Sequence, residues 1–164
     1  MKNREVLDYC EQLLQGGGLK PIKLSGLFII HKLSKNMDKL EKVARHIKPE
    51  TLMPESKEYK EYTDKIRTLY AKHSKGKTKM VGGREIMDIE GNEKAFAKDV
   101  QSVNKEYAKA IEERQKQIDD YNEFLEKETD EKIEIDQVTV DDVEKHNPNI
   151  DMETYSLIKW MIKD

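Results

Sequence analysis

The clearest pattern in the sequence runs from residue 30 to residue 47 and reads IHKLSKNMDKLEKVARHI. Its apolar residues follow one another at intervals of three and four, which is the spacing of a helix face that packs against another helix. This seam consists of Ile30, Leu33, Met37, Leu40, Ala44 and Ile47. Pro49 closes the predicted helix, because proline cannot donate a backbone hydrogen bond and disfavours helical geometry in the preceding residue.

A second helix with the same spacing is predicted from about residue 54 or 56 to residue 73. Its seam consists of Tyr59, Tyr62, Ile66 and Leu69, with His73 one turn further on. Two matched seams joined by a short proline-containing link favour an antiparallel pair of helices. Upstream, a helix over residues 3–14 is predicted to end at Gly16-Gly17-Gly18, and Ser25 is the expected N-cap of the helix that contains residues 30–47.

Small β elements and a long helix are predicted in the remaining sequence. Gly82-Gly83, flanked by short alternating runs, indicates a β-hairpin near residues 79–89. A helix of roughly 50 Å is predicted over residues 92–127, and its polar stretch 112–117 either faces solvent or contacts a partner. The β-branched residues of 132–140 indicate a strand that could pair with the hairpin.

The C-terminal region is expected to contain short capped helices. Thr139 or Asp141 is the predicted cap of a first helical turn, and Asp151 that of a final helix. Trp160 is expected to dock this last helix onto the body of the protein, because an exposed tryptophan would leave a large apolar surface in water.

Composition predicts a mainly α protein. Hydrophobic residues make up 36% of the chain and charged residues 38%, which suits long helices with thin apolar seams better than a compact ball. We therefore expect an antiparallel helical bundle or coiled-coil-like helices with a small β element. At 164 residues the chain is predicted to be a single domain, with a helical core over about 25–127 and an acidic α/β region over about 128–164.

Charge is distributed unevenly along the chain. Residues 1–118 contain 25 lysines and arginines against 18 acidic residues, whereas residues 119–164 contain 5 against 15. Such polarity fits docking of an acidic tail on a basic body, head-to-tail association, or a basic surface for a partner.

No motif points to catalysis, to a cofactor or to a metal site. The four histidines lie in separate segments, no phosphate-binding loop or serine nucleophile motif occurs, and the acidic residues are too numerous to single out a catalytic pair. Cys10 is the only cysteine and is expected to behave as a small buried hydrophobe in a reducing compartment. The sequence also lacks a signal peptide pattern and a membrane-spanning stretch, so a cytoplasmic protein is expected. Because no catalytic motif is found, no small-molecule substrate is expected.

One segment of the sequence is strongly basic. Between residues 65 and 84 there are seven basic residues and no acidic one. These are Lys65, Arg67, Lys72, Lys75, Lys77, Lys79 and Arg84. They could form a surface for a protein partner or attract a nucleic acid backbone, or they could be ordinary solvated helix faces and a mobile loop.

The order of these elements resembles that of small uncharacterised proteins of tailed bacteriophages. The similar features are Ile22-Lys23-Leu24-Ser25 before a basic helix, a glycine-containing loop before a long helix, the acidic strand, and the capped C-terminal helices. The resemblance implies a phage accessory protein, either part of the particle or a factor that binds a host component in the host cytoplasm. The leading hypothesis is thus a non-enzymatic protein interaction or assembly protein, and the alternative is a nucleic-acid-binding module. An enzyme would require a deep polar pocket formed by dispersed carboxylates and histidines.

Overall fold

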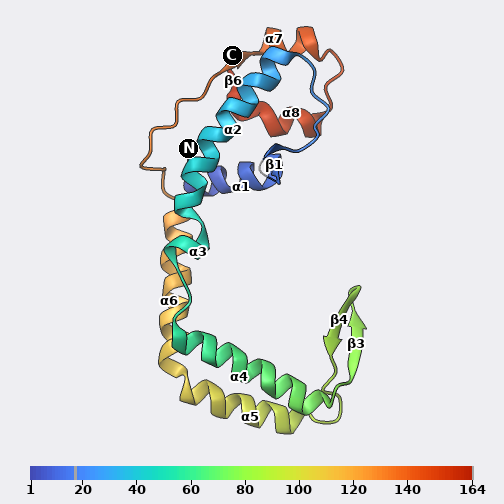
Figure 1. Ribbon diagram of the computed structural model, residues 1–164, viewed down its shortest axis with the longest axis vertical. Coiled ribbons are helices and arrows are strands. Elements are labelled where there is room, and N and C mark those ends of the chain that lie inside the picture. Colours follow the sequence, from blue (N-terminus) through green and yellow to red (C-terminus); the bar gives the residue numbers. More distant parts are fainter. Residues whose placement is uncertain (17, 164) are drawn as a thin grey trace. The chain divides into compact units, whose positions relative to one another are not determined.

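The computed structural model describes residues 1–16 and 18–163, and it is mainly α-helical (Figure 1). In these residues the β structure consists of three separate two-stranded sheets and one isolated bridge between Lys2 and Glu128. This confirms the predicted fold class of a mainly α protein with small β elements. Of the predicted Gly16-Gly17-Gly18 terminator, Gly17 lies outside the described residues, and the first helix ends just before it.

Eight α-helices and a short 3-10 helix are described, together with six strands. The helices are α1 (Asn3–Leu13), α2 (Leu27–Ile47), α3 (Pro49–Leu52), α4 (Lys57–Ser74), α5 (Glu93–Glu106), α6 (Ala108–Leu125), α7 (Val140–His146), α8 (Met152–Ile158) and η1 (Lys159–Met161). The strands are β1 (Leu14–Gln15), β2 (Gly18–Leu19), β3 (Thr78–Val81), β4 (Arg84–Met87), β5 (Val138–Thr139) and β6 (Ile162–Lys163).

These elements form two compact units. The terminal unit comprises residues 1–52 and 121–164, and the central unit comprises residues 53–120. The division differs from the expected arrangement of one helical core over 25–127 with an appended region 128–164. The acidic C-terminal segment belongs to the same unit as the first two long helices, because its apolar residues share their core.

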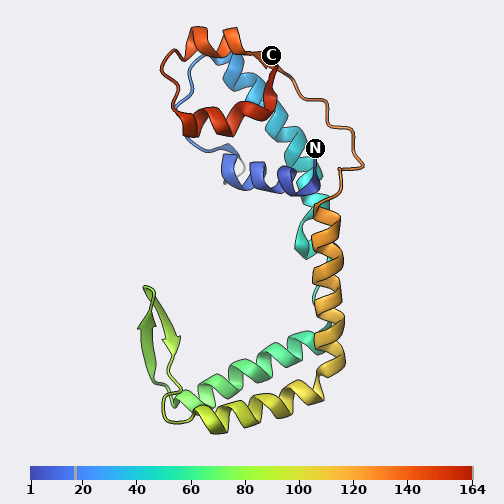
Figure 2. The ribbon, with the colours of Figure 1, turned by 180° about the vertical axis from the view of Figure 1, so that it is seen from behind.

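The terminal unit contains the main hydrophobic core. Figure 2 shows the C-terminal helices in red beside α1 and α2. The core contains fully buried side chains from α1, α2 and the C-terminal helices. Among them are Val6, Leu13, Leu33, Met37, Leu40, Val143, Ile158 and Met161. Trp160 is half-buried and stacks on Tyr9 with ring centroids 5.1 Å apart, so the last helix docks as predicted.

The seam of α2 is buried, but its partner differs from the predicted one. Five of the six seam residues are buried and Ile30 is half-buried. Ile29 and Val43 are buried as well, so the apolar face is wider than an a/d seam. This face packs against α1 and the C-terminal segment, instead of against the helix that begins after Ser56. This apolar face is too wide for one partner helix to cover, so two neighbouring segments cover it together.

The predicted strand 132–140 is mostly extended chain without a strand partner. Only Val138 and Thr139 form a strand, and they pair in parallel with Ile162 and Lys163 rather than with the hairpin. The reason lies on α2, where the buried amide of Asn36 donates to the carbonyl of Asp136 and accepts from its N–H. These side-chain bonds satisfy backbone groups that would otherwise have required a neighbouring strand.

The central unit is built on an antiparallel pair of helices. α4 and α5 run side by side and are connected by the predicted hairpin of β3 and β4 (Figure 1). The predicted long helix 92–127 is interrupted at Tyr107, whose φ of −105° and ψ of 19° lie outside helical values, so that α5 and α6 are separate helices. Most of the polar stretch 112–117 is exposed, although Arg114 donates to the carbonyl of Met53 at 2.7 Å.

Two of the predicted helix caps are present: Thr139 caps α7, and Asp151 accepts from the Thr154 N–H at 2.7 Å. Ser56 also caps α4, and its hydroxyl accepts from the Tyr59 N–H at 3.1 Å. Ser25, by contrast, is not the N-cap of α2, because Gly26 occupies that position with a φ of 95°. A side chain at this glycine would both strain the backbone and meet the His146 side chain at 3.1 Å.

Candidate functional site

The central unit has very little buried interior. Within residues 53–120 only His73, Ser74 and Ala110 are buried, and the apolar residues of α4 and α5 are at best half-buried. Covering an apolar side chain fully is worth roughly 1.5–3 kcal/mol relative to leaving it exposed. The helix pair therefore gains only part of the stabilisation that its apolar side chains could provide.

Aromatic contacts hold α4 and α5 together along the predicted seam. Tyr62 lies 6.0 Å from Tyr107 between ring centroids, and its hydroxyl donates to Asn104 at 3.1 Å. At the other end Phe96 contacts Tyr70 at 4.6 Å. The four predicted seam residues of α4, namely Tyr59, Tyr62, Ile66 and Leu69, are all half-buried, so they contribute to this packing without being enclosed by it.

A polar cluster closes the end of the helix pair nearest the hairpin. Asp99 accepts from Lys72 and contacts His73, each at 2.9 Å, while Asn92 donates to the His73 carbonyl. The hydrogen bond from Lys72, followed by that from His73, lowers the pKa of the Asp99 carboxyl. The spacing of apolar residues predicts His73 on the seam but does not reveal its partner, because Asp99 lies on another helix and no local spacing signals the pair.

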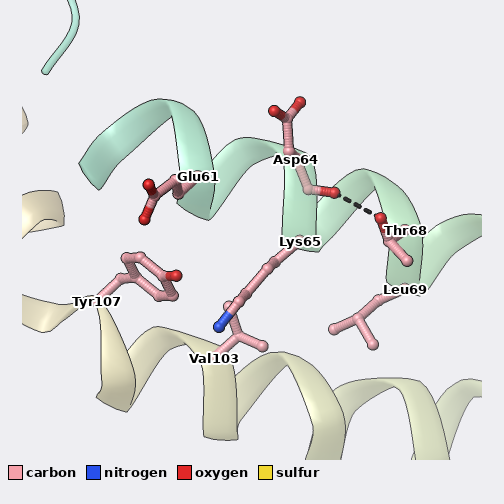
Figure 3. A pocket seen from close by; sticks show the side chains of 7 residues that line it. All are labelled: Glu61, Asp64, Lys65, Thr68, Leu69, Val103 and Tyr107. Carbon is pink, nitrogen blue, oxygen red and sulfur yellow. Dashed lines mark hydrogen bonds between the residues drawn. The ribbon is translucent and has the colours of Figure 1, made fainter. Parts of the chain in front are cut away.

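A first open groove lies between α4 and α5, with a volume of about 430 Å³. Figure 3 shows Leu69 and Val103 among its lining residues, with charged side chains of α4 nearby. One of these, Lys65, donates to Glu106 at 2.6 Å and lies 4.8 Å from the centroid of the Tyr107 ring. The hydrogen bond to Glu106 is the main cause that raises the Lys65 pKa.

A second groove of about 380 Å³ lies between α4 and the hairpin. Its lining is largely apolar and consists of Thr63, Ile66, Arg67, Tyr70, Ile86 and Met87. Beside it, the hairpin exposes 67% of Met80 and 53% of Val81. The apolar side chains of the hairpin and of the adjacent turns of α4 thus remain open to solvent in the central unit.

The seven basic residues of 65–84 do not form one continuous free patch. Four of them have acidic partners within 3.1 Å. These pairs are Lys65–Glu106, Arg67–Asp64, Lys72–Asp99 and Lys79–Asp88. Across the described residues, Lys75, Lys77 and Arg84 have no ion-pair partner within 4.0 Å. The positive charge left over is therefore concentrated at the hairpin.

The described chain offers no cluster of three or more histidine, cysteine or acidic side chains positioned to hold a metal ion. Its helices, as far as they are described, include none that is long and apolar enough to span a membrane. Cys10 is half-buried beside the terminal core, and burial raises the pKa of its thiol to about 11.

Comparisons with protein-family models, with curated proteins and with solved structures give no match to this chain.

Proposed function

We propose that the protein is a non-enzymatic interaction or assembly protein, and that its central unit docks a protein partner. The observation behind this proposal is the uncovered apolar surface formed by the hairpin and the adjoining face of α4. Its exposed members are Tyr70, Met80, Val81, Ile86 and Met87. An apolar surface of this kind on a unit with few buried residues is typical of a protein contact site.

The terminal unit also exposes apolar side chains, and they provide an internal comparison. Leu27 is 88% exposed at the start of α2, and Phe28 lies beneath the ammonium group of Lys32, 4.3 Å from the ring centroid. These residues belong to a unit that already has a buried core, so their exposure costs the fold little. The central unit lacks such a core, which supports placing the partner there.

Nucleic acid binding by residues 65–84 remains the alternative function. Lys75, Lys77 and Arg84 support it, because they have no ion-pair partner in the described part of the chain. Each of the other four basic residues would have to give up its ion pair with an acidic side chain before it could bind a phosphate. With about three free charges, the affinity would fall only moderately with salt, by roughly a factor of twenty to fifty between 50 and 200 mM.

Affinity capture from the cell that produces the protein tests the proposed function. Ile86→Ser combined with Met87→Ser removes apolar surface from the hairpin, and Leu27→Ser is the control on the terminal unit. We expect a partner, or a second copy, that is retained by wild type and by the control and lost with the hairpin variant. A strict monomer by native mass spectrometry that captures no protein, or equal capture by both variants, contradicts the proposal.

The resemblance of the sequence to small proteins of tailed bacteriophages indicates where such a module would act. A docking module of this kind would serve a phage as a particle component or as a factor that binds a host protein in the cytoplasm. Light scattering at several concentrations separates binding of a second copy from binding of another protein.

A further inference from the structure

The β3 edge of the hairpin is open. β3 pairs only with β4 in the described chain, and β4 is the strand that contacts α4. The Asp88 N–H donates to the Lys77 carbonyl at 2.9 Å, which makes this a hydrogen-bonded pair of the ladder. Since such pairs alternate with non-bonded ones, the backbone groups of Lys79 and Val81 point toward β4 and those of Thr78 and Met80 point outward.

The two faces of the hairpin differ in chemistry. The register places Lys79 opposite Ile86 and Val81 opposite Arg84, so these four side chains share one face with Lys77 and its opposite neighbour Asp88. Asp88 pairs with Lys79 at 3.0 Å, and the three basic residues leave this face with a net positive charge. The other face contains Met80 and Met87, with Thr78 and Glu85. A strand added beside β3 would alternately place its side chains next to the lysines and next to Met80.

We propose that the β3 edge binds an extended, acidic segment of a protein partner in which acidic and apolar residues alternate. This inference rests on the proposed function and specifies the chemistry of the partner. Acidic side chains would lie beside Lys77, which has no ion-pair partner in the described chain, and beside Lys79, where they would compete with Asp88. Apolar side chains would extend the surface of Met80. The outward backbone groups of Thr78 and Met80 would hydrogen-bond the added strand.

The terminal unit shows how this chain binds a segment of that composition. Residues 133–136, Ile-Glu-Ile-Asp, alternate in the same way and run extended beside α2. Asp136 lies 3.0 Å from Lys39 and 3.2 Å from Lys35, its backbone is bonded by Asn36, and the two isoleucines are half-buried. Lysines, backbone bonds and apolar contacts therefore act together on an acidic extended segment.

A second copy of β3 and a nucleic acid each fit the edge less well. Pairing of two β3 edges would bring the lysines of both copies onto one face, where like charges oppose each other. A phosphate backbone would match the lysines but offers no apolar group for Met80 and Met87. An acidic polypeptide satisfies both faces.

The test uses the full chain and a fluorescein-labelled synthetic peptide with four Asp-Val repeats, read out by fluorescence anisotropy. Lys77→Glu with Lys79→Glu reverses the charge of the edge, and Lys94→Glu with Lys98→Glu makes the same charge change at exposed positions of α5. Met80→Pro removes one outward N–H and leaves the lysines in place. We expect the edge variants to weaken binding by roughly tenfold or more and the α5 control to bind as wild type does, within about a factor of two.

Hydrogen exchange gives a second readout on the wild-type protein. The amides of Thr78 and Met80 are expected to gain protection at saturating peptide. Equal binding by all variants, no binding by wild type, or unchanged exchange at these two amides overturns the inference.

Two further outcomes distinguish the alternatives. A single-stranded oligonucleotide that binds in a Lys77- and Lys79-dependent way, where the peptide does not, replaces the inference with nucleic acid recognition. If a captured partner depends on Ile86 and Met87 but not on Lys77, Lys79 and Met80, the edge inference fails while the proposed function stands.

Discussion

The buried amide of Asn36 bonds both backbone groups of Asp136, accepting from its N–H at 2.8 Å and donating to its carbonyl at 3.0 Å. A helix side chain thereby holds an extended segment one hundred residues away in sequence. The arrangement fixes residues 133–138 on α2 and brings Ile133 and Ile135 against the terminal core.

Replacing Asn36 is expected to destabilise the terminal unit. Asn36→Leu leaves the partly buried N–H and carbonyl of Asp136 without their side-chain partner, at a cost of up to about 1–3 kcal/mol each. Urea unfolding followed by the fluorescence of Trp160, the only tryptophan, reports on this unit. Asn122→Leu at an exposed position of α6 is the control and should change the midpoint little. Equal midpoints for the two variants would show that the Asn36 bonds contribute nothing.

Acid is expected to loosen the same segment. Hydrogen bonds from Lys39 and Lys35 hold the pKa of Asp136 below its ordinary value of 3.8. A pKa that is lower in the folded state stabilises the fold above the unfolded value, and this contribution is lost as the pH falls through the lowered pKa. We expect NMR titration to give Asp136 a pKa below 3.8. We also expect Asp136→Asn to flatten the pH dependence of unfolding, as followed by Trp160 fluorescence, below about pH 4. An Asp136 pKa above 4 would contradict this.

The N-cap of α4 tests the stability of the central unit. Ser56→Ala removes the acceptor for the Tyr59 N–H and should destabilise the helix by about 0.5–2 kcal/mol, whereas Ser56→Gly should cost a few tenths. Exchange rates of the α4 amides measure the change. Ser102→Ala, at an exposed position of α5, serves as the control. Faster exchange in α4 for the control than for Ser56→Ala would argue against the cap.

Cys10 is expected to react slowly. Its pKa of about 11 leaves roughly a hundredfold less thiolate at neutral pH than an unperturbed cysteine has. Alkylation by iodoacetamide should therefore be slower by about that factor than in denaturant, and it should accelerate up to a pH near 11. A rate equal to that of the unfolded chain would place the thiol in solvent.

Local signals in the sequence predicted the helices and strands of this fold better than the segments against which they pack. The caps Thr139 and Asp151 were predictable, because the bonds they make span only three residues. The hairpin followed in the same way from Gly82-Gly83, both of which have positive φ.

The packing partner of each helix was not predictable, because an apolar seam does not specify which surface covers it. Nothing in the residues around Tyr107 marks the break between α5 and α6, since neither proline nor glycine is present there. The acidic partners of Lys65 and Lys72 lie on another helix, so the free charge at the hairpin could be identified only once α4 and α5 were seen together.

Photo-crosslinking from single positions in the cell that produces the protein is the most direct test of partner docking at the hairpin. A photoreactive amino acid at Val81 probes the hairpin, and one at Met152 on the terminal unit, which is 77% exposed against 53% for Val81, probes a more open control site. We expect a discrete protein adduct from position 81 that is absent from position 152. Adducts only from position 152, or none from position 81, would contradict docking at the hairpin.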